Sequence, residues 1–251
     1  MFIDIHNHLN YYGDEKISKI VERARKENVN YILVNGTDVK SNRKILELDR
    51  EYEEVKVALG VYPMECLEMG SEKLDDEISF IRDNKEHVKA IGEVGMDLKE
   101  AEPETLEQQK ENLSKFVKLS MELDIPIIVH SRKAEKETIE LLEDLGAKKV
   151  IMHCFFGSRK LIKRIIDNGW YLTVPTCVCY NNQMQELVEL VPVEKMFCET
   201  DSPYMHPGRA KNNEPSLVIE SYKKVAEIKQ ISLNELENTI EENLKSLFLS
   251  E

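Results

Sequence analysis

The chain has 251 residues, of which 41% are hydrophobic and 32% are charged, and its formal net charge at pH 7 is −13. So acidic a chain argues against broad, non-specific coating of nucleic acid, which needs a basic surface, but it does not exclude an enzyme that acts on nucleic acid. No basic segment precedes the first apolar run, which Asp4 and His6 interrupt, and no apolar stretch approaches the roughly 18 residues of a membrane span. We therefore expect a cytoplasmic protein whose five cysteines are reduced thiols.

Short apolar runs of strand type alternate along the chain with longer stretches of helical periodicity. The expected strands cover residues 2–5, 31–35, 55–59, 88–91, 125–129, 150–152, 170–174 and 196–198. The expected helices cover residues 15–27, 41–52, 72–84, 103–123, 135–145, 158–168, 182–190, 215–229 and 233–248. Eight βα repeats with short connections predict an α/β fold, a (β/α)8 TIM barrel with C-terminal helices, as one domain over residues 1–251. An open, doubly wound sheet is the alternative.

Polar residues gather where the expected strands end. His6 and His8 close the first strand, and residues two apart in a strand point to the same face. The equivalent positions of later strands hold Glu93, His130, His153 and Asp201. Because the carboxyl ends of barrel strands meet at one face, these six side chains should converge there. A dry barrel core would not tolerate so many polar groups without a purpose.

Four imidazoles and two carboxylates suit one or two divalent metal ions, and no thiolate is needed. A carboxylate can bridge two ions, and Glu93 is the natural bridge because it comes from the middle of the strand order. The set predicts metal-assisted hydrolysis, with Zn, Mn, Mg, Co and Ni all compatible as the metal. A metal-binding scaffold without activity is the non-enzymatic alternative.

Several segments, in order, resemble the TatD family of metal-dependent deoxyribonucleases, which belongs to the amidohydrolase-like TIM barrels. These segments are residues 3–9 (IDIHNHL), 92–97 (GEVGMD), 129–132 (VHSR), 152–158 (MHCFFGS), 199–204 (ETDSPY), 213–215 (NEP) and 242–248 (ENLKSLF). The resemblance runs from Phe2 to the last helix. It implies a metal-dependent hydrolase with two ions per subunit.

The resemblance also implies a role for each site residue. One ion would be held by His6, His8, Glu93 and Asp201, and the other by Glu93, His130 and His153. Asp201 would orient or deprotonate the attacking water. Glu199 would be a second catalytic carboxylate, or alternatively a salt-bridge partner inside the barrel. Arg132 would contact a phosphate at the mouth, or alternatively form an ion pair or cap a helix.

Two features bear on the substrate. Where the family usually has Gly-x-His-Pro after the third strand, this chain has Gly60-Val61-Tyr62-Pro63. Tyr62 can donate a hydrogen bond to substrate, but it does not titrate near neutral pH. The long connection 202–214 carries Arg209, a candidate contact for a phosphodiester, although a solvated loop with incidental cations is the alternative.

Two functions fit these residues. The first is a phosphodiesterase acting on DNA as a 3′-to-5′ or endonucleolytic deoxyribonuclease, which the family motifs favour. The second is a hydrolase of a small ester, lactone or amide, which the net charge and Tyr62 favour. The expected partner is DNA or a small phosphodiester. We expect a monomer with no membrane association and no obligate protein partner.

Overall fold

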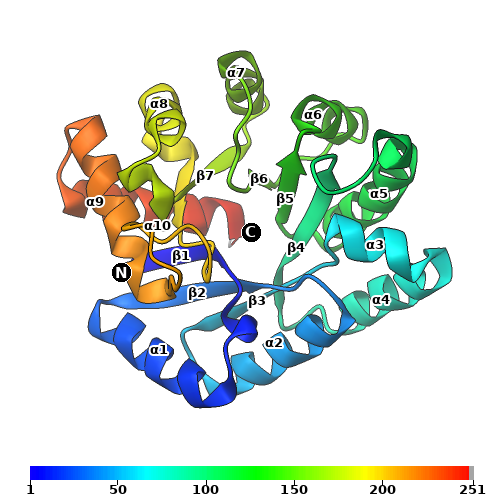
Figure 1. Cartoon of the computed structure of the whole chain (residues 1–251), viewed down its shortest axis with the longest axis horizontal. Helices are drawn as coiled ribbons and strands as arrows, with labels where there is room; N and C mark the ends of the chain where they lie inside the picture. The colour runs from blue at the N-terminus through cyan, green and yellow to red at the C-terminus, as the bar shows by residue number, and fades with distance from the viewer. Residues whose placement is uncertain (249–251) are drawn as a thin grey trace.

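The computed structural model describes residues 1–248, in which eight strands form one parallel sheet in the order of the chain (Figure 1). The strands are β1 (Phe2–Asn7), β2 (Val29–Asn35), β3 (Val55–Leu59), β4 (Val88–Asp97), β5 (Ile127–Arg132), β6 (Val150–Met152), β7 (Tyr171–Pro175) and β8 (Met196–Glu199). Each strand pairs in parallel with the next one along the chain.

The last strand returns to the first, beside the carboxyl ends of both. The backbone N–H of Asp201 donates to the carbonyl of His6 at 3.0 Å, and that of His8 donates to the carbonyl of Ser202 at 2.8 Å. The buried Asp4 accepts from the backbone N–H and the hydroxyl of Thr200, at 2.8 and 2.7 Å. These contacts join β1 to the segment after β8, so the predicted barrel is confirmed.

Ten α-helices within residues 1–248 surround the strands (Figure 1). They are α1 (Asp14–Lys26), α2 (Val39–Glu51), α3 (Pro63–Met69), α4 (Ser71–Asp83), α5 (Leu106–Leu123), α6 (Glu135–Asp144), α7 (Arg159–Asp167), α8 (Asn182–Leu190), α9 (Val218–Lys229) and α10 (Leu233–Phe248). None of the helices in this described part of the chain is long and apolar enough to cross a membrane.

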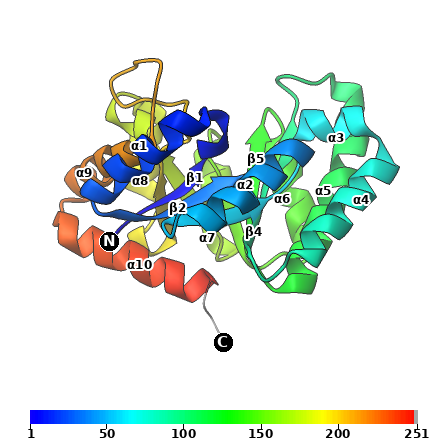
Figure 2. The same ribbon diagram turned by 90° about the horizontal axis from the view of Figure 1, so that it is seen from below.

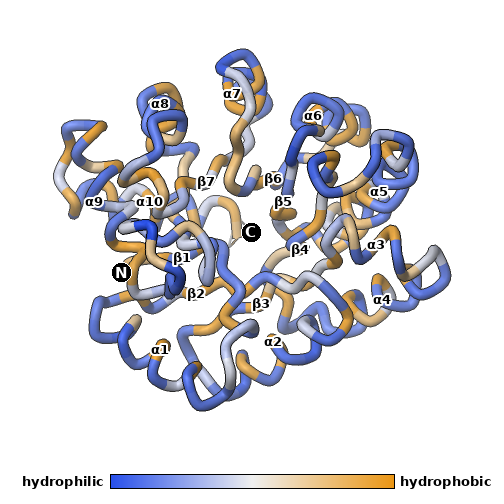
Figure 3. The backbone as a smooth tube through the Cα atoms, in the orientation of Figure 1, coloured by the Kyte–Doolittle hydropathy of each residue, from blue (hydrophilic) through white to orange (hydrophobic). Residues whose placement is uncertain are grey.

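The hydrophobic core lies inside the sheet and between the sheet and its helices. Apolar segments follow the strands, while the helices alternate between apolar and polar residues (Figure 3). In α1, for example, Ile17, Ile20, Val21 and Ala24 are buried at helical spacing. This pattern gives each helix one apolar stripe against the sheet and leaves its charged residues in water.

The C-terminal helix α10 lies on the side of the barrel where β1 begins (Figure 2). The N-terminal ammonium contacts Glu237 of α10 at 2.5 Å. The side-chain amide of Asn243 donates to the carbonyls of Val193 and Met196 at 2.9 Å each, just before and at the start of β8. The helix therefore covers the end of the barrel opposite the carboxyl ends of the strands.

Several elements begin or end two or three residues from the expected positions, as β5 does, which was expected at 125–129, and two elements differ more. The fourth strand was expected to end at Ile91, but β4 continues to Asp97. Gly92 and Gly95 interrupt its apolar pattern because both are packed closely against neighbouring strands: a Cβ at Gly92 would be 2.9 Å from side-chain atoms of Asn35 and Ile128, and a Cβ at Gly95 would be 1.9 Å from the carbonyl oxygen of His130. Helix α3 was not expected, because it is short and only Pro63 and Cys66 are buried in it; Pro63 stands at its first turn, where proline is tolerated.

Candidate metal centre

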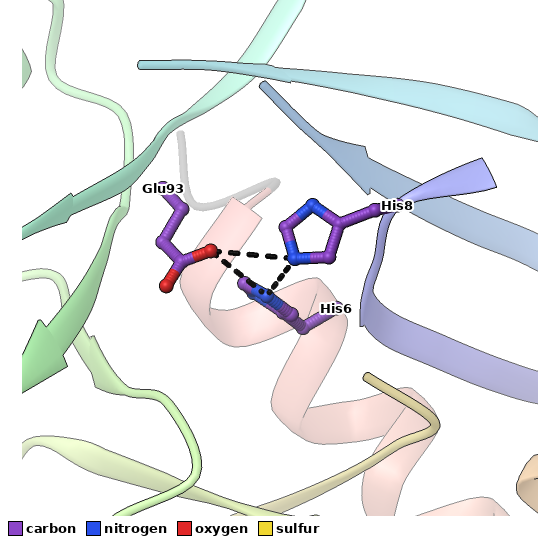
Figure 4. Close-up of side chains that lie close together, drawn as sticks. All are labelled: His6, His8 and Glu93. Atoms are coloured by element: carbon purple, nitrogen blue, oxygen red, sulfur yellow. Dashed lines mark hydrogen bonds and ion pairs between the residues drawn. The ribbon is translucent and has the colours of Figure 1, made fainter. Parts of the chain in front are cut away.

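Glu93 lies at the centre of the six predicted ligands and faces two separate pairs of histidines. Its Oε2 atom is 3.5 Å from Nε2 of His6 and 3.4 Å from Nε2 of His8 (Figure 4). Its Oε1 atom is 3.0 Å from Nδ1 of His130 and 3.9 Å from Nε2 of His153. Each carboxylate oxygen therefore belongs to a different group of nitrogen atoms, which is the arrangement of a bridging ligand.

Asp201 completes the first of these groups. Its Oδ1 atom is 3.8 Å from Nε2 of His6 and 3.7 Å from Nε2 of His8, and these two nitrogens are 3.3 Å apart. The candidate ligand atoms of three sets lie within 4.8 Å of one another: His6, His8 and Glu93; His6, His153 and Asp201; and Glu93, His130 and His153. The structure thus brings together all six residues, and their ligation of metal stays a prediction.

In three of the four histidines, the ring nitrogen that faces away from the centre lies against a hydrogen-bond acceptor. Nδ1 of His8 lies 3.0 Å from the carbonyl of Asn35, and Nδ1 of His153 lies 3.0 Å from Oε2 of Glu199. Nε2 of His130 lies 3.0 Å from Oδ2 of Asp97. An acceptor at one nitrogen keeps the proton there and leaves the other nitrogen's lone pair free to bind metal.

His6 is held differently. Among the residues that the structure describes, its Nδ1 atom has no hydrogen-bond partner. Its ring instead stacks on that of His153, with the centroids 3.6 Å apart. Burial, followed by the nearby His153, lowers the pKa of His6 to about 4, so this imidazole is neutral at pH 7 and available as a ligand.

The two ligand carboxylates differ in their protonation. Burial alone would raise the pKa of Glu93, but hydrogen bonds with His130, His6 and His8 outweigh it and hold this pKa well below its usual range. Burial raises the pKa of Asp201 to about 6, although His153 and His8 partly oppose the shift. Asp201 is therefore the more basic of the two carboxylates.

Two of the histidines near these carboxylates, His153 and His130, favour the protonated form, in contrast to His6. Burial would lower the pKa of His153, but Glu199, Asp201 and Glu93 outweigh burial and raise this pKa to about 10. The pKa of His130 is also raised, because hydrogen bonds with Asp97 and Glu93 overcome the effect of burial. These histidines would release protons when a cation binds, because a ligand imidazole must be neutral.

A cavity of about 780 Å³ opens from this centre to the surface. Its lining carboxylates are Asp38, Glu65, Glu93, Glu100, Glu135 and Asp201, and its lining cations other than histidine are Arg132 and Lys133. Acidic side chains therefore outnumber lysine and arginine side chains in the lining of this cavity.

The predicted substrate contacts are not all at this cavity. Tyr62 and Arg132 line it, and Nη1 of Arg132 is 3.2 Å from Oε1 of Glu100. Arg209 is not among the lining residues; its guanidinium carbon is 4.5 Å from the centre of the Tyr180 ring. Glu199 is fully buried, and its Oε2 atom lies 3.0 Å from Nδ1 of His153, on the side of that ring away from the Glu93 carboxylate.

Asp97 is the site residue that sequence reasoning missed. Its Oδ2 atom accepts hydrogen bonds from the Tyr62 hydroxyl at 2.8 Å and from His130, while Oδ1 accepts from the backbone N–H groups of Lys99 and Glu100 at 2.7 and 3.0 Å. Glu93 and Asp97 are four residues apart on one strand and therefore share a face. That spacing is the signal that could have found it.

Imidazole and carboxylate donors in this arrangement suit divalent ions of the first transition row, and the carboxylates also suit Mg²⁺. The family model described as TatD related DNase matches residues 3–249. The chain belongs to the TatD family.

Relatives of this TatD-family chain extend over its whole length. It is 33% identical to an uncharacterized metal-dependent hydrolase, YabD, of Bacillus subtilis (strain 168), over 99% of both chains. It is 31% identical to the deoxyribonuclease TATDN3 of Homo sapiens, over 98% of this chain and 94% of that one. The crystal structure of YJJV, a TatD homolog from Escherichia coli K12, matches with a TM-score of 0.90 at 25% identity, over 100% of this chain and 98% of that one. The chain is therefore a metal-dependent hydrolase.

Proposed function

We propose that the protein is a phosphodiesterase acting on DNA and that it uses two divalent ions bridged by Glu93. The observation that carries this proposal is the division of the Glu93 carboxylate, with one oxygen toward His6 and His8 and the other toward His130 and His153. Two ions held side by side suit the in-line displacement of a phosphodiester, because the attacking and the leaving oxygen both need stabilisation. The human relative named as a deoxyribonuclease supports DNA as the substrate.

The distances support the two ligand sets that the family resemblance implies. One ion would be held by His6, His8, Glu93 and Asp201, and the other by Glu93, His130 and His153. Such ions lower the pKa of a bound water and neutralise charge on the phosphoryl oxygens.

The remaining chemistry belongs to side chains of this protein. Asp201 orients the attacking water and accepts its proton at a carboxylate oxygen. In the metal-free site burial raises the pKa of Asp201 to about 6, whereas the pKa of Glu93 is lowered, and this difference supports Asp201 rather than Glu93 as the proton acceptor. Glu199 acts through His153 as a positioning residue, because its contact is with the Nδ1 atom of that ring. Arg132 contacts a substrate phosphate after exchanging its ion pair with Glu100.

A small ester, lactone or amide is the second candidate substrate, and the acidic cavity mouth favours it. Long DNA brings many phosphates close to Asp38, Glu65, Glu100 and Glu135, which repel them at low ionic strength. A small neutral substrate avoids this repulsion.

An activity screen separates the two. Protein loaded with Mg²⁺, Mn²⁺, Zn²⁺ or Co²⁺ is assayed against single-stranded DNA, a p-nitrophenyl phosphodiester, and a panel of lactones and amides. Cleavage of DNA and of the phosphodiester is the expected result. Turnover of a lactone or amide without any phosphodiester cleavage would overturn the proposal. Metal content by mass spectrometry should give two ions per chain.

A further inference from the structure

Two exposed tyrosines stand at the rim of the cavity. Within residues 1–248 they are the aromatic members of the large hydrophobic side chains that stay exposed, with Tyr11 at 46% and Tyr204 at 56%. Both line the cavity that opens from the candidate metal centre. An aromatic ring that stays in water keeps a large apolar surface uncovered, so this rim offers a favourable contact to a flat group that covers it.

Both tyrosines contact the ring of the predicted metal ligand His8. The Tyr11 ring lies nearly parallel to the His8 ring, at an angle of 15° and with the centroids 5.0 Å apart. The Tyr204 ring lies across the His8 ring, at an angle of 71° and with the centroids 6.4 Å apart. Because one face of Tyr11 rests on His8, its exposed surface is the opposite face and the ring edges. A group bound against either tyrosine is thus one side chain away from the predicted ion.

Contacts behind these residues fix the Tyr11 ring and the Tyr204 backbone. The hydroxyl of Tyr11 is 2.9 Å from the hydroxyl of Thr37. The backbone N–H of Tyr204 donates to the carbonyl of Asp201 at 2.8 Å, and the Tyr204 carbonyl accepts from the side-chain amide of Asn213 at 2.7 Å. A contact that is already in place loses less conformational entropy when a ligand binds to it.

The charge of the cavity favours one part of a DNA strand at this rim. Acidic side chains outnumber lysine and arginine side chains in the lining, so a phosphate away from the metal centre gains little attraction there. A nucleobase is flat and uncharged, and these carboxylates do not repel it. Every base has a π-face, and stacking on aromatic side chains adds to affinity whichever base is present.

We propose that Tyr11 and Tyr204 are specificity-determining residues, whose rings stack against the nucleobase of the nucleotide next to the scissile phosphodiester. This inference rests on the proposed function and deepens it, because it assigns the base to the rim while Arg132 contacts a phosphate. A hydrogen bond from each hydroxyl to the substrate is the competing role. That role needs the hydroxyl, whereas stacking needs the ring.

The test compares two p-nitrophenyl phosphodiesters on the metal-loaded protein. In one, the second ester group is thymidine, joined through its 5′ oxygen; in the other, hydrogen replaces the base of that nucleoside. For the wild type we expect kcat/KM for the thymidine ester to exceed that for the abasic ester by about tenfold or more, which is the order of a stacking contribution. Tyr11→Ala and Tyr204→Ala should each lower this ratio about fivefold. Tyr11→Phe and Tyr204→Phe should keep the ratio, because they keep the ring.

Tyr52→Ala is the matched control, because Tyr52 lies between α2 and β3 and does not line the cavity. Its ratio should match that of the wild type. Comparing the two esters within one variant cancels any change in metal content. A wild-type ratio near one overturns the inference, and so does a wild-type ratio in either rim alanine variant. A phenylalanine variant that loses as much as the alanine variant at the same position also overturns it, because the hydroxyl then makes the contact.

A binding measurement separates this inference from the proposed function. If neither ester nor DNA is cleaved, the proposed function fails. Calorimetry on the metal-loaded protein then compares thymidine 5′-monophosphate with the same phosphate ester without its base. Tighter binding of the nucleotide that is lost in both rim alanine variants and kept in both phenylalanine variants supports the role of the two rings. Equal binding of the two compounds to the wild type refutes it.

Discussion

Replacing Asp97 by Asn should weaken metal binding at the His130 side of the centre without removing any ligand. The Asp97 carboxylate satisfies four donors: the N–H groups of Lys99 and Glu100 at one oxygen, and Tyr62 and His130 at the other. An amide has only one acceptor oxygen. If that oxygen stays with the backbone groups, the amide N–H₂ faces the Nε2–H of His130, and two donors oppose each other.

His130 then has two unfavourable choices. It can keep its proton on Nε2 against a donor, or move it to Nδ1, where the proton faces Glu93 and blocks the lone pair that would bind the ion. Turning the amide over leaves two backbone N–H groups unpaired instead, at about 1–3 kcal/mol for each buried group. Loss of a partner behind a metal ligand typically reduces affinity about 10- to 100-fold, or about 1.4 to 2.7 kcal/mol.

Isothermal calorimetry with Mn²⁺ or Zn²⁺ measures this effect directly. The wild-type protein should bind two ions, and Asp97→Asn should bind one of them about 10- to 100-fold more weakly. Asp144→Asn makes the same chemical change on an exposed helix position and should bind both ions as the wild type does. Wild-type affinity for both ions in Asp97→Asn would refute the role of Asp97 in fixing the His130 tautomer.

Three further outcomes are expected. Asp201→Asn should lower the rate of hydrolysis about 10²- to 10⁴-fold, because the proton acceptor is lost. The metal-free variant should unfold at an equal or higher urea concentration than the wild type, because burial disfavours the charged carboxylate. A rate of hydrolysis within tenfold of the wild type would contradict this assignment. Metal binding at pH 7 should release at least one proton per chain, because His153, whose pKa is raised to about 10, must lose its proton to act as a ligand. The apparent affinity for the metal should therefore rise with pH up to about 10. Calorimetry in buffers of different ionisation enthalpy measures the number of protons released on metal binding. A release of zero protons would exclude His153 as their source. Tyr222→Phe should lower the free energy of unfolding by about 1–3 kcal/mol in urea titration, because Tyr222 on α9 holds the buried N–H of Ile3 at 3.1 Å. The exposed Tyr204→Phe should cost under about 0.5 kcal/mol, and equal losses in both variants would argue against the Ile3 contact.

The order of strands and helices could be predicted from the chain because hydrophobic periodicity is a local property. The same is true of the grouping of His6, His8, Glu93, His130 and Asp201, since residues at the carboxyl ends of parallel strands must meet at one face. The extension of β4 to Asp97 could not be predicted, because the glycines that interrupt its apolar pattern are required by close packing against the neighbouring strands.

The chemical role of each side chain depended on contacts between distant segments. The sequence by itself determined that Tyr62 stands after β3 and Glu199 on β8. Only the tertiary structure decided that Tyr62 gives its proton to Asp97, that Glu199 lies behind His153, and that His130 turns Nδ1 rather than Nε2 toward Glu93. The reason is that a side chain's rotamer, tautomer and hydrogen-bond direction are set by partners 33 to 46 residues away in the chain, and these are known only once the barrel has closed.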